Sequence, residues 1–330
     1  MSAVPMDMNV VEMTTAGGPS VLVAGRRPTT RASKGEVLIR VAAAGINGPD
    51  LMQRRGLYPA PQGASDLLGL EVSGEIVEVG ENVERWTVGS MVTALTNGGG
   101  YAEYVAVDAR HCLPIPKGVS LIDSAGLPET FFTVWSNIFV GARLSPGETL
   151  LVHGGAGGIG TTAIQLGKAF GAIVIATDSP EERCNICRDL GADRAIDFRN
   201  EDFVEIVREY KGANVILDIV GGPYVERNIK AAAPDGRIVQ LAFALGSKIE
   251  LNLMPIMLKR LSYTGSTLRT RSADFKAQIA KELEVRVWPL IESGQIKPVT
   301  RRIFPLNDAS VALSLMESAG HVGKILLTLN

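Results

Sequence analysis

Short apolar runs separated by polar turns fill the first third of the chain and predict β-strands there. Residues 71–80 alternate apolar and polar positions with the period of two that is typical of a half-buried strand. Runs at 36–42, 91–95 and 101–107 also have strand-like lengths, and Asn97-Gly-Gly-Gly100 separates the last two. Short strands joined by glycine-rich turns predict a compact, barrel-like β unit.

Beyond about residue 120 the pattern changes to strands that alternate with helices. Apolar strand runs lie at 149–153, 173–176, 194–198, 215–220 and 237–243, with helical segments between them at 161–170, 180–190, 202–210 and 224–232. This alternation predicts a parallel sheet with helices on both faces. Two further helices are predicted at 273–293 and 308–318, before a last strand at 324–329. Because that strand needs a sheet to join, we expect the second domain to be inserted within the first.

Residues 155–160, Gly-Ala-Gly-Gly-Ile-Gly, match the pattern G-x-G-x-x-G between a predicted strand and a predicted helix. In this pattern Gly155 permits the tight turn, Gly157 lets a pyrophosphate approach the backbone, and Gly160 lets helix and strand pack closely. Gly158 and Ile159 complete the loop at a helix N-terminus, which attracts phosphate. The motif predicts dinucleotide binding, and a purely structural glycine turn is the alternative.

Asp178 ends the strand that follows this motif. An acidic residue at that place normally accepts hydrogen bonds from the adenosine ribose and repels a 2′-phosphate, which favours NADH. Arg183 lies one helical turn further on and is long enough to reach a 2′-phosphate, as are Arg269 and Arg271 from a later loop. Asp178 as merely the N-cap of the next helix is the remaining alternative.

Composition restricts the functional class. The 330 residues include 33 Lys+Arg and 35 Asp+Glu, a formal net charge of −2 that draws the chain neither to nucleic acid nor to an anionic membrane. Three cysteines do not make a disulfide framework and are typical of a reducing compartment. No apolar run approaches the ~18 residues of a membrane span, and residues 1–11 lack a secretory signal. We therefore expect a cytoplasmic protein of roughly two domains without nucleic-acid or membrane partners.

Several further motifs are recognisable along the whole chain, at 45–58, 68–74, 127–130, 217–222, 268–271 and 323–325. With the glycine loop, they resemble the medium-chain dehydrogenase/reductase superfamily, specifically its zinc-independent quinone oxidoreductase branch and, within it, the p53-inducible type. The resemblance implies an α/β fold. A GroES-like β-barrel catalytic domain would comprise residues 1–125 and 267–330, around an inserted Rossmann domain with a doubly wound parallel sheet at 126–266.

The metal ligands of the superfamily's zinc enzymes are missing. Those enzymes hold a catalytic zinc with a cysteine and a histidine at the positions of Asn47 and Leu70. A leucine cannot ligate zinc, and Glu71 by itself is not a metal site. The family's structural zinc needs four closely spaced cysteines, one more than the chain contains. We therefore expect catalysis without a metal.

The resemblance implies hydride transfer from a reduced nicotinamide to a small acceptor that is already electrophilic, namely a quinone. Most such reductases use NADPH, although Asp178, and Phe198 in place of a common tyrosine, leave NADH open. The alternative is reduction of an activated alkene, an enone or enoyl thioester. A non-enzymatic role as a crystallin-like or RNA-binding protein is a third interpretation. The resemblance also implies a homodimer formed at an edge of the Rossmann sheet.

The resemblance assigns roles to individual residues. Asn47 would face the nicotinamide or the acceptor, and Tyr58 would donate a hydrogen bond to the acceptor oxygen. The alternatives are a turn asparagine and a buried aromatic. Asp50, the third catalytic candidate, is better suited to fixing its loop, and Glu71 to a structural role. The other cofactor contacts that the resemblance implies are Thr133, Phe198, Phe243, Ser266, Leu268, Arg271, Gly323 and Lys324.

Overall fold

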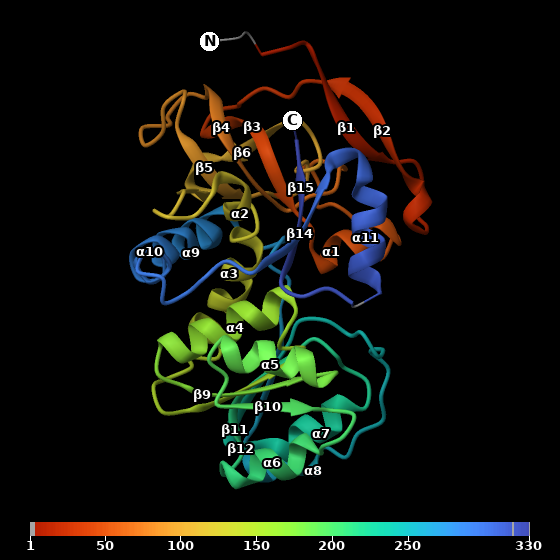
Figure 1. Cartoon of the computed structure of the whole chain (residues 1–330), viewed down its shortest axis with the longest axis vertical. Coiled ribbons are helices and arrows are strands. Elements are labelled where there is room, and N and C mark those ends of the chain that lie inside the picture. Colours follow the sequence, from red (N-terminus) through yellow and green to blue (C-terminus); the bar gives the residue numbers. More distant parts are fainter. Residues whose placement is uncertain (1–3, 319, 330) are drawn as a thin grey trace. The chain divides into compact units, whose positions relative to one another are not determined.

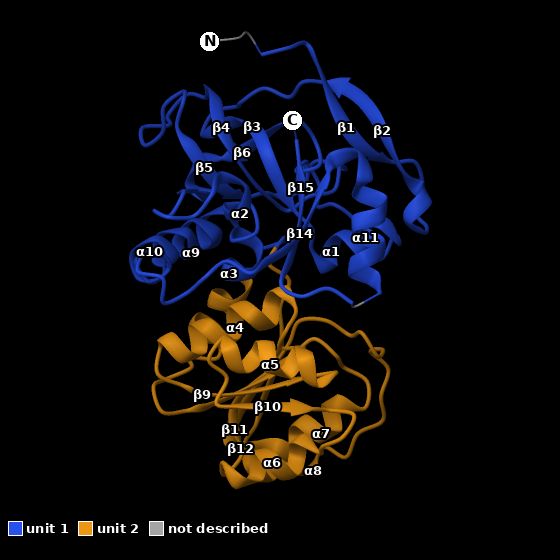
Figure 2. Ribbon diagram, viewed as in Figure 1, with its two compact units in different colours: residues 1–132, 269–330 blue, residues 133–268 orange. Residues whose placement is uncertain are grey.

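The computed structural model describes residues 4–318 and 320–329, which divide into two compact units (Figures 1 and 2). Unit 1 contains both ends of the chain, Met1–Phe132 and Arg269–Asn330, and unit 2 is Thr133–Leu268. The first boundary falls within helix α3 (Pro128–Val134). The predicted fold class is confirmed, because a β-rich unit is interrupted by a unit built on a parallel sheet.

Unit 2 is a parallel sheet with helices on both faces (Figure 1). The strand order is β10 (Arg194–Asp197), β9 (Ile173–Asp178), β8 (Thr149–His153), β11 (Ala213–Asp218), β12 (Ala232–Gln240), β13 (Ser262–Gly265). One face carries α4 (Gly158–Ala169) and α5 (Glu181–Asp189), and the other carries α6 (Phe203–Glu209), α7 (Tyr224–Ala231) and α8 (Met254–Lys259). The chain order reverses between β8 and β11, where doubly wound sheets bind ligands.

The sequence forms this sheet because its strands are apolar on both faces. Leu151, Ile175, Ile196, Ile216 and Ile238, from neighbouring strands, are all fully buried in one hydrophobic cluster, and the alternate positions Leu150, Val174 and Val215 are fully buried as well. A strand covered by helices on both sides needs a continuous apolar run rather than alternation. This requirement explains why the pattern in the second third of the chain differs from that in the first.

Unit 1 is mainly an antiparallel sheet. Its strand order is β14 (Thr300–Pro305), β15 (Lys324–Thr328), β3 (Glu36–Gly45), β4 (Glu71–Val79), β5 (Met91–Leu95), β7 (Cys112–Pro114). In addition β6 (Tyr104–Asp108) pairs with β3, and β1 (Asp7–Met13) pairs with β2 (Leu22–Pro28). The prediction that the last strand joins the β-rich first third is confirmed by the antiparallel pairing of β15 with β3.

Strand register in unit 1 brings three distant segments together. Because β3 runs antiparallel to both β15 and β4, its end lies beside the start of each. Gly45 of β3 pairs with Leu326 of β15, and Ala44 pairs with Val72 of β4. Ile46, which follows β3, Glu71 at the start of β4 and Lys324 at the start of β15 therefore lie close together in unit 1.

One predicted helix is wrong in its extent. The sequence predicts a single helix at 273–293, whereas α9 (Ala273–Arg286) ends before α10 (Trp288–Glu292) begins. Pro289 explains the break, because proline lacks the N–H that a helix interior needs and is tolerated in a first turn. Unit 1 also contains α1 (Gly48–Arg54), α2 (Leu121–Ser124) and α11 (Ala309–Glu317). Within the described residues, no helix combines the length and the apolar character that crossing a membrane requires.

Candidate functional site

The glycine loop of unit 2 joins β8 to α4, and two of its glycines are required by packing. A Cβ atom on Gly155 would lie 2.6 Å from Cys187 Sγ, and one on Gly160 would lie 2.2 Å from Gly154 O. No side chain of any size is compatible with such approaches. The absence of side chains therefore lets the loop lie against α5 and β9 at Gly155 and fold tightly on its own backbone at Gly160.

Gly157 differs from these two glycines. It is the N-cap of α4 with φ −77°, an ordinary conformation, and the helix has no side-chain cap and no acidic residue in its first turn. A Cβ atom on Gly157 would meet only Gly154 O, at 3.5 Å, which is a normal contact. Neither packing nor backbone conformation therefore requires a glycine here. The close approach of a phosphate to a helix N-terminus does require one, so the loop fits a dinucleotide.

Asp178, at the carboxyl end of β9, is 4% exposed and surrounded by donors. Its Oδ2 accepts a hydrogen bond from Ala156 N and its Oδ1 from Ser179 N, both at 2.8 Å. Arg183 of α5 donates from Nε to Oδ1 at 2.5 Å and from Nη2 to Oδ2 at 3.4 Å. The N-cap of α5 is Pro180, so the alternative that Asp178 caps this helix is wrong.

The structure brings most of the other predicted cofactor residues of unit 2 to the same edge of the sheet. Phe198 follows β10, and its backbone N–H donates to Asp178 O at 3.2 Å. Phe243 and Ser266 follow the carboxyl ends of β12 and β13, which are parallel to β8. Thr133 is buried in α3, and Leu268 is the last residue of unit 2.

His153, the residue before the glycine loop, is a core residue. It is fully buried, and its ring nitrogens lie 2.8 Å from Thr177 Oγ1 and 2.7 Å from Asn228 Oδ1. Burial lowers the pKa of His153, so the ring is neutral at neutral pH. Because the amide oxygen accepts only, His153 carries its proton on Nε2 and links β8 to β9 and α7.

In unit 1, Asn47, Glu71 and Lys324 form a closed polar cluster. Lys324 Nζ lies 2.6 Å from Glu71 Oε1 and donates to Asn47 Oδ1 and, at 3.1 Å, to Ile46 O. Asn47 Nδ2 in turn donates to Glu71 Oε1 at 2.9 Å. Glu71 Oε2 accepts from Glu129 N at 2.8 Å. Lys324 therefore fixes the orientation of the Asn47 amide and is the ion-pair partner of the Glu71 carboxylate.

Gly45 makes room for this cluster. A Cβ atom there would lie 1.9 Å from Glu71 Oε1. Within residues 4–318 and 320–329, no three His, Cys, Asp or Glu side chains are grouped so that they could hold a metal ion. At the place where the resemblance puts a zinc, the residues are the neutral Asn47, the apolar Leu70 and a carboxylate already paired with an ammonium group.

Asp50 fixes the start of α1. It is buried, and its Oδ2 accepts from Asn47 N at 2.8 Å and from Tyr101 OH at 3.2 Å, while Oδ1 accepts from Gly69 N at 3.0 Å. Burial raises the pKa of Asp50 to about 6, although these donors oppose the shift. These contacts support the structural role that the sequence favours for Asp50.

Tyr58 is half-buried beside Arg269, whose Cζ lies 5.8 Å from the ring centroid. Burial raises the pKa of Tyr58, so the phenol keeps its proton at neutral pH and can donate a hydrogen bond. Arg269 is itself buried, and donates to Gln53 Oε1 at 2.6 Å and to Asn97 O at 2.7 Å. It therefore anchors the loop at Asn97 within unit 1.

Two other predicted cofactor residues of unit 1 have local explanations. Gly323 has φ +62°, and a Cβ atom there would lie 2.0 Å from Val299 O, so packing alone requires this glycine. The guanidinium of Arg271 lies over the Phe275 ring at 4.0 Å. Their assignment to the cofactor stays a prediction.

The pairing of Glu71 with Lys324 and the anchoring role of Arg269 were not predicted from the sequence. A signal for the first was present, since a glutamate at the start of an apolar strand must be paired with a cation if it is buried. Lys324, at the start of the predicted last strand, is a cation that can pair with it. Only the register of β15, β3 and β4 shows that Lys324 and Glu71 meet.

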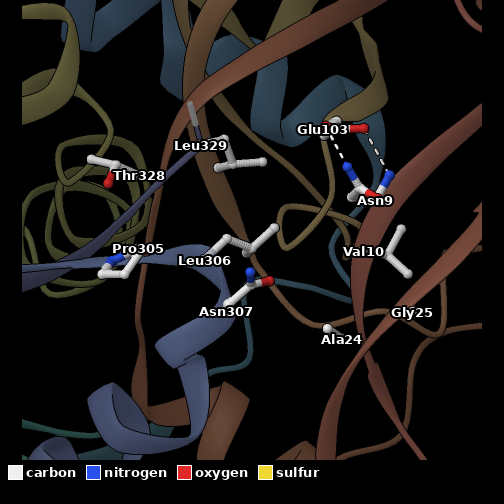
Figure 3. A pocket seen from close by; sticks show the side chains of 10 residues that line it. All are labelled: Asn9, Val10, Ala24, Gly25, Glu103, Pro305, Leu306, Asn307, Thr328 and Leu329. Atoms are coloured by element: carbon white, nitrogen blue, oxygen red, sulfur yellow. Dashed lines mark hydrogen bonds between the residues drawn. The ribbon is translucent and has the colours of Figure 1, made fainter.

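A pocket of ≈ 330 Å³ lies elsewhere in unit 1 (Figure 3). Its lining comes from β1, β2, Glu103, residues 305–307 and the end of β15. The carboxylate of Glu103 accepts from Asn9 N at 2.7 Å and Asn9 Nδ2 at 2.8 Å, as Figure 3 shows. No predicted site residue lines this pocket, so it is separate from the candidate site.

Known proteins resemble both units of this chain. Residues 33–117 match the family model of the alcohol dehydrogenase GroES-like domain, and residues 158–284 match that of the zinc-binding dehydrogenase. A Danio rerio synaptic vesicle membrane protein VAT-1 homolog is 29% identical over 89% of this chain, which spans 64% of that protein. A Mycobacterium tuberculosis mycocerosic acid synthase-like polyketide synthase is also 29% identical over 89% of the chain, which spans 14% of it.

Solved structures match nearly the whole chain. An NAD-dependent alcohol dehydrogenase is 30% identical, with a TM-score of 0.87 covering 98% of this chain and 100% of the other. Escherichia coli quinone oxidoreductase complexed with NADPH is 28% identical, with a TM-score of 0.86 and coverages of 98% and 99%. The CurK enoyl reductase is 27% identical, with a TM-score of 0.86 and coverages of 99% and 100%. With both units matched in order, the chain belongs to the medium-chain dehydrogenase/reductase superfamily of oxidoreductases.

Proposed function

We propose that this protein reduces quinones by hydride transfer from NADPH, without a metal ion. The observation that carries the proposal is the contact of Lys324 with Glu71 and Asn47. A zinc site needs deprotonated ligands free to bind it, whereas the carboxylate here is already paired with a cation and the amide is held by both. Such a site suits an acceptor that is electrophilic without Lewis-acid activation, and the E. coli neighbour is a quinone oxidoreductase with NADPH.

Each unit has its own task in this proposal. Bound NADPH supplies the hydride. The N-terminus of α4 binds the pyrophosphate, where Gly157 leaves the backbone open. The Tyr58 phenol, kept protonated by the raised pKa, donates a hydrogen bond to the acceptor oxygen. Asn47 faces the nicotinamide or the acceptor with an amide whose orientation is fixed by Lys324 and Glu71.

The test is oxidation of NADPH and of NADH by the purified protein with ortho-quinones, para-quinones, simple enones and crotonyl-CoA. Reactions without acceptor serve as the control. We expect turnover with at least one quinone class and faster turnover with NADPH. Clear reduction of an alkene, with no turnover of any quinone, would overturn the proposal.

Reduction of activated alkenes is the second candidate. Its support is the similarity to the CurK enoyl reductase and to a segment of a mycobacterial polyketide synthase. Both reactions deliver hydride to an electrophilic π system, so the hydride donor and the candidate residues are the same. The enone and crotonyl-CoA reactions of the same assay distinguish a small alkene from a thioester carrier.

The proposed assembly is a homodimer through the β13 edge of unit 2. Among the described strands β13 pairs only with β12, so it is an edge strand to which another strand could be added. The preceding helix α8 exposes Met257 and Leu258 at 68% and 65%. A second copy would pair the edge and cover the apolar side chains. The p53-inducible type and the cytoplasmic location stay predictions from the sequence.

A further inference from the structure

We infer that Asp178 is a positioning residue that holds the glycine loop and Arg183, and that Arg183 recognises the 2′-phosphate of the cofactor. The inference rests on the proposed use of NADPH and deepens it. The position of Asp178 at the end of the second strand of the sheet predicts the opposite role, that of an acceptor for ribose hydroxyls. Its contacts decide between the two roles.

The carboxylate of Asp178 can accept hydrogen bonds at about four lone-pair sites. Oδ1 already accepts from Ser179 N and Arg183 Nε, and Oδ2 accepts from Ala156 N. Arg183 Nη2 approaches Oδ2 as well. With only 4% of the residue exposed, two ribose hydroxyls would have to displace donors that the protein supplies.

The ion pair with Arg183 also changes the electrostatics around Asp178. A free carboxylate at this place would repel a 2′-phosphate, but the charge of Asp178 is compensated by Arg183 at 2.5 Å. The ion pair holds the guanidinium by its Nε side, and 17% of the Arg183 side chain stays exposed. Guanidinium groups bind phosphate through a planar fork of N–H donors. The pair therefore turns an acidic position into one that tolerates phosphate.

Asp178 also contacts the glycine loop. The bond from Ala156 N joins the end of β9 to the segment just before the N-cap of α4. Cys187, one turn after Arg183 on α5, packs against Gly155 of the same loop. Asp178 thus places the loop and Arg183 relative to each other, and its loss would disturb both.

The two roles predict opposite signs for Asp178→Asn. Removing a ribose acceptor that repels phosphate would strengthen binding of 2′-phosphorylated ligands relative to unphosphorylated ones. Removing a positioning residue would weaken that preference, because Arg183 would lose its anchor. The sign of the change is therefore diagnostic, and it does not depend on any acceptor substrate.

The experiment is calorimetric binding of 2′,5′-ADP and of 5′-ADP to the full chain and to three variants, each checked for an unchanged thermal midpoint. The wild-type protein is expected to prefer 2′,5′-ADP. Arg183→Gln should reduce that preference about tenfold, as loss of a charge-assisted bond does, and Asp178→Asn should reduce it too. Arg188→Gln is the matched control, because Arg188 pairs with Glu181 on the exposed side of the same helix.

An increased preference for 2′,5′-ADP in Asp178→Asn would overturn the inference, as would an unchanged preference in Arg183→Gln. If Asp178→Asn fails to fold, comparison of Arg183→Gln with Arg188→Gln still decides whether Arg183 recognises the 2′-phosphate. A wild-type protein that prefers 2′,5′-ADP but reduces no quinone leaves the inference standing and removes the proposed acceptor. A wild-type protein that prefers 5′-ADP removes both the inference and the choice of NADPH.

Discussion

Lys324 and Glu71 form a buried ion pair in unit 1, with Nζ 2.6 Å from Oε1 and side-chain exposures of 7% and 0%. The two residues begin β15 and β4, strands that both border β3. Burying an ion pair costs desolvation energy. Removing one partner of a buried pair typically lowers the free energy of unfolding by about 3–5 kcal/mol. The pair therefore links β4, in the first part of the chain, to the last strand, β15. Single substitutions at either residue should strongly destabilise the fold.

A double-mutant cycle tests this link. We expect Glu71→Gln and Lys324→Met each to lower the free energy of unfolding by about 3–5 kcal/mol, because each leaves an uncompensated buried charge. The double variant should recover at least half of the summed loss, since no unpaired charge remains. Urea denaturation measures the free energy of unfolding of the wild type, the two single variants and the double variant. Additive losses would show that the two side chains do not stabilise each other.

The glycine loop gives a second prediction, with its own control. Gly160→Ala should strongly destabilise or unfold the protein, because the new Cβ would lie 2.2 Å from a backbone oxygen. Gly157→Ala has room for its Cβ and an allowed φ, so stability should change by less than about 1 kcal/mol. Its dissociation constant for NADPH should rise at least about tenfold, as measured by fluorescence titration. Unchanged NADPH binding in Gly157→Ala would place the pyrophosphate elsewhere.

Much of unit 2 was predictable from the sequence because its signals are local. Apolar runs, helical segments and the glycine pattern each lie within a few residues, and they fixed the strand and helix order. The role of Asp178 was not predictable in the same way. Its donors come from the glycine loop, the next residue and α5, and only the folded arrangement shows that they occupy the carboxylate.

The candidate site in unit 1 was predictable as a set of residues but not as an arrangement. The motifs pointed to Asn47, Asp50 and Tyr58, and the tail motif to Lys324. That Lys324 contacts Asn47 depends on pairing between strands from opposite ends of the chain. The hairpin of β1 and β2 was also missed, because the second half of β2, Gly25-Arg-Arg-Pro28, has no apolar–polar alternation.

Tyr58→Phe tests the proposed donor. Loss of the hydroxyl should lower kcat with a quinone by about a hundredfold, the lower range for a positioned proton donor, and leave the KM for NADPH nearly unchanged. Stability should stay within about 0.5 kcal/mol, because the half-buried ring is retained. Tyr210→Phe, a partly buried tyrosine of unit 2, is the matched control. Full activity in Tyr58→Phe would remove the phenol from the reaction.

The raised pKa of Asp50 predicts a pH-dependent stability. Burial raises the pKa from the model-compound value of 3.8 to about 6, so the folded protein binds this proton more tightly than the unfolded chain. The resulting stabilisation is complete below pH 3.8 and is lost as the pH rises through 6. Relative to Asp50→Asn, which does not titrate, the wild-type free energy of unfolding should fall by about 2 kcal/mol between pH 4 and pH 7. A difference between the two proteins that stays constant over this range would contradict the shift.

The exposed edge of unit 2 gives the last prediction. If α8 and β13 form the dimer surface, replacing Met257 by Lys and Leu258 by Glu inserts charges into it without changing the net charge. Light scattering after gel filtration at micromolar concentration should show a dimer for the wild type and a monomer for this variant, because unpaired charges in an interface oppose association. The matched control is Val285→Glu, at a similarly exposed apolar position of unit 1, at 67%, which should leave the dimer intact. A monomeric wild type would refute the dimer, and a dimeric double variant would move the interface away from α8.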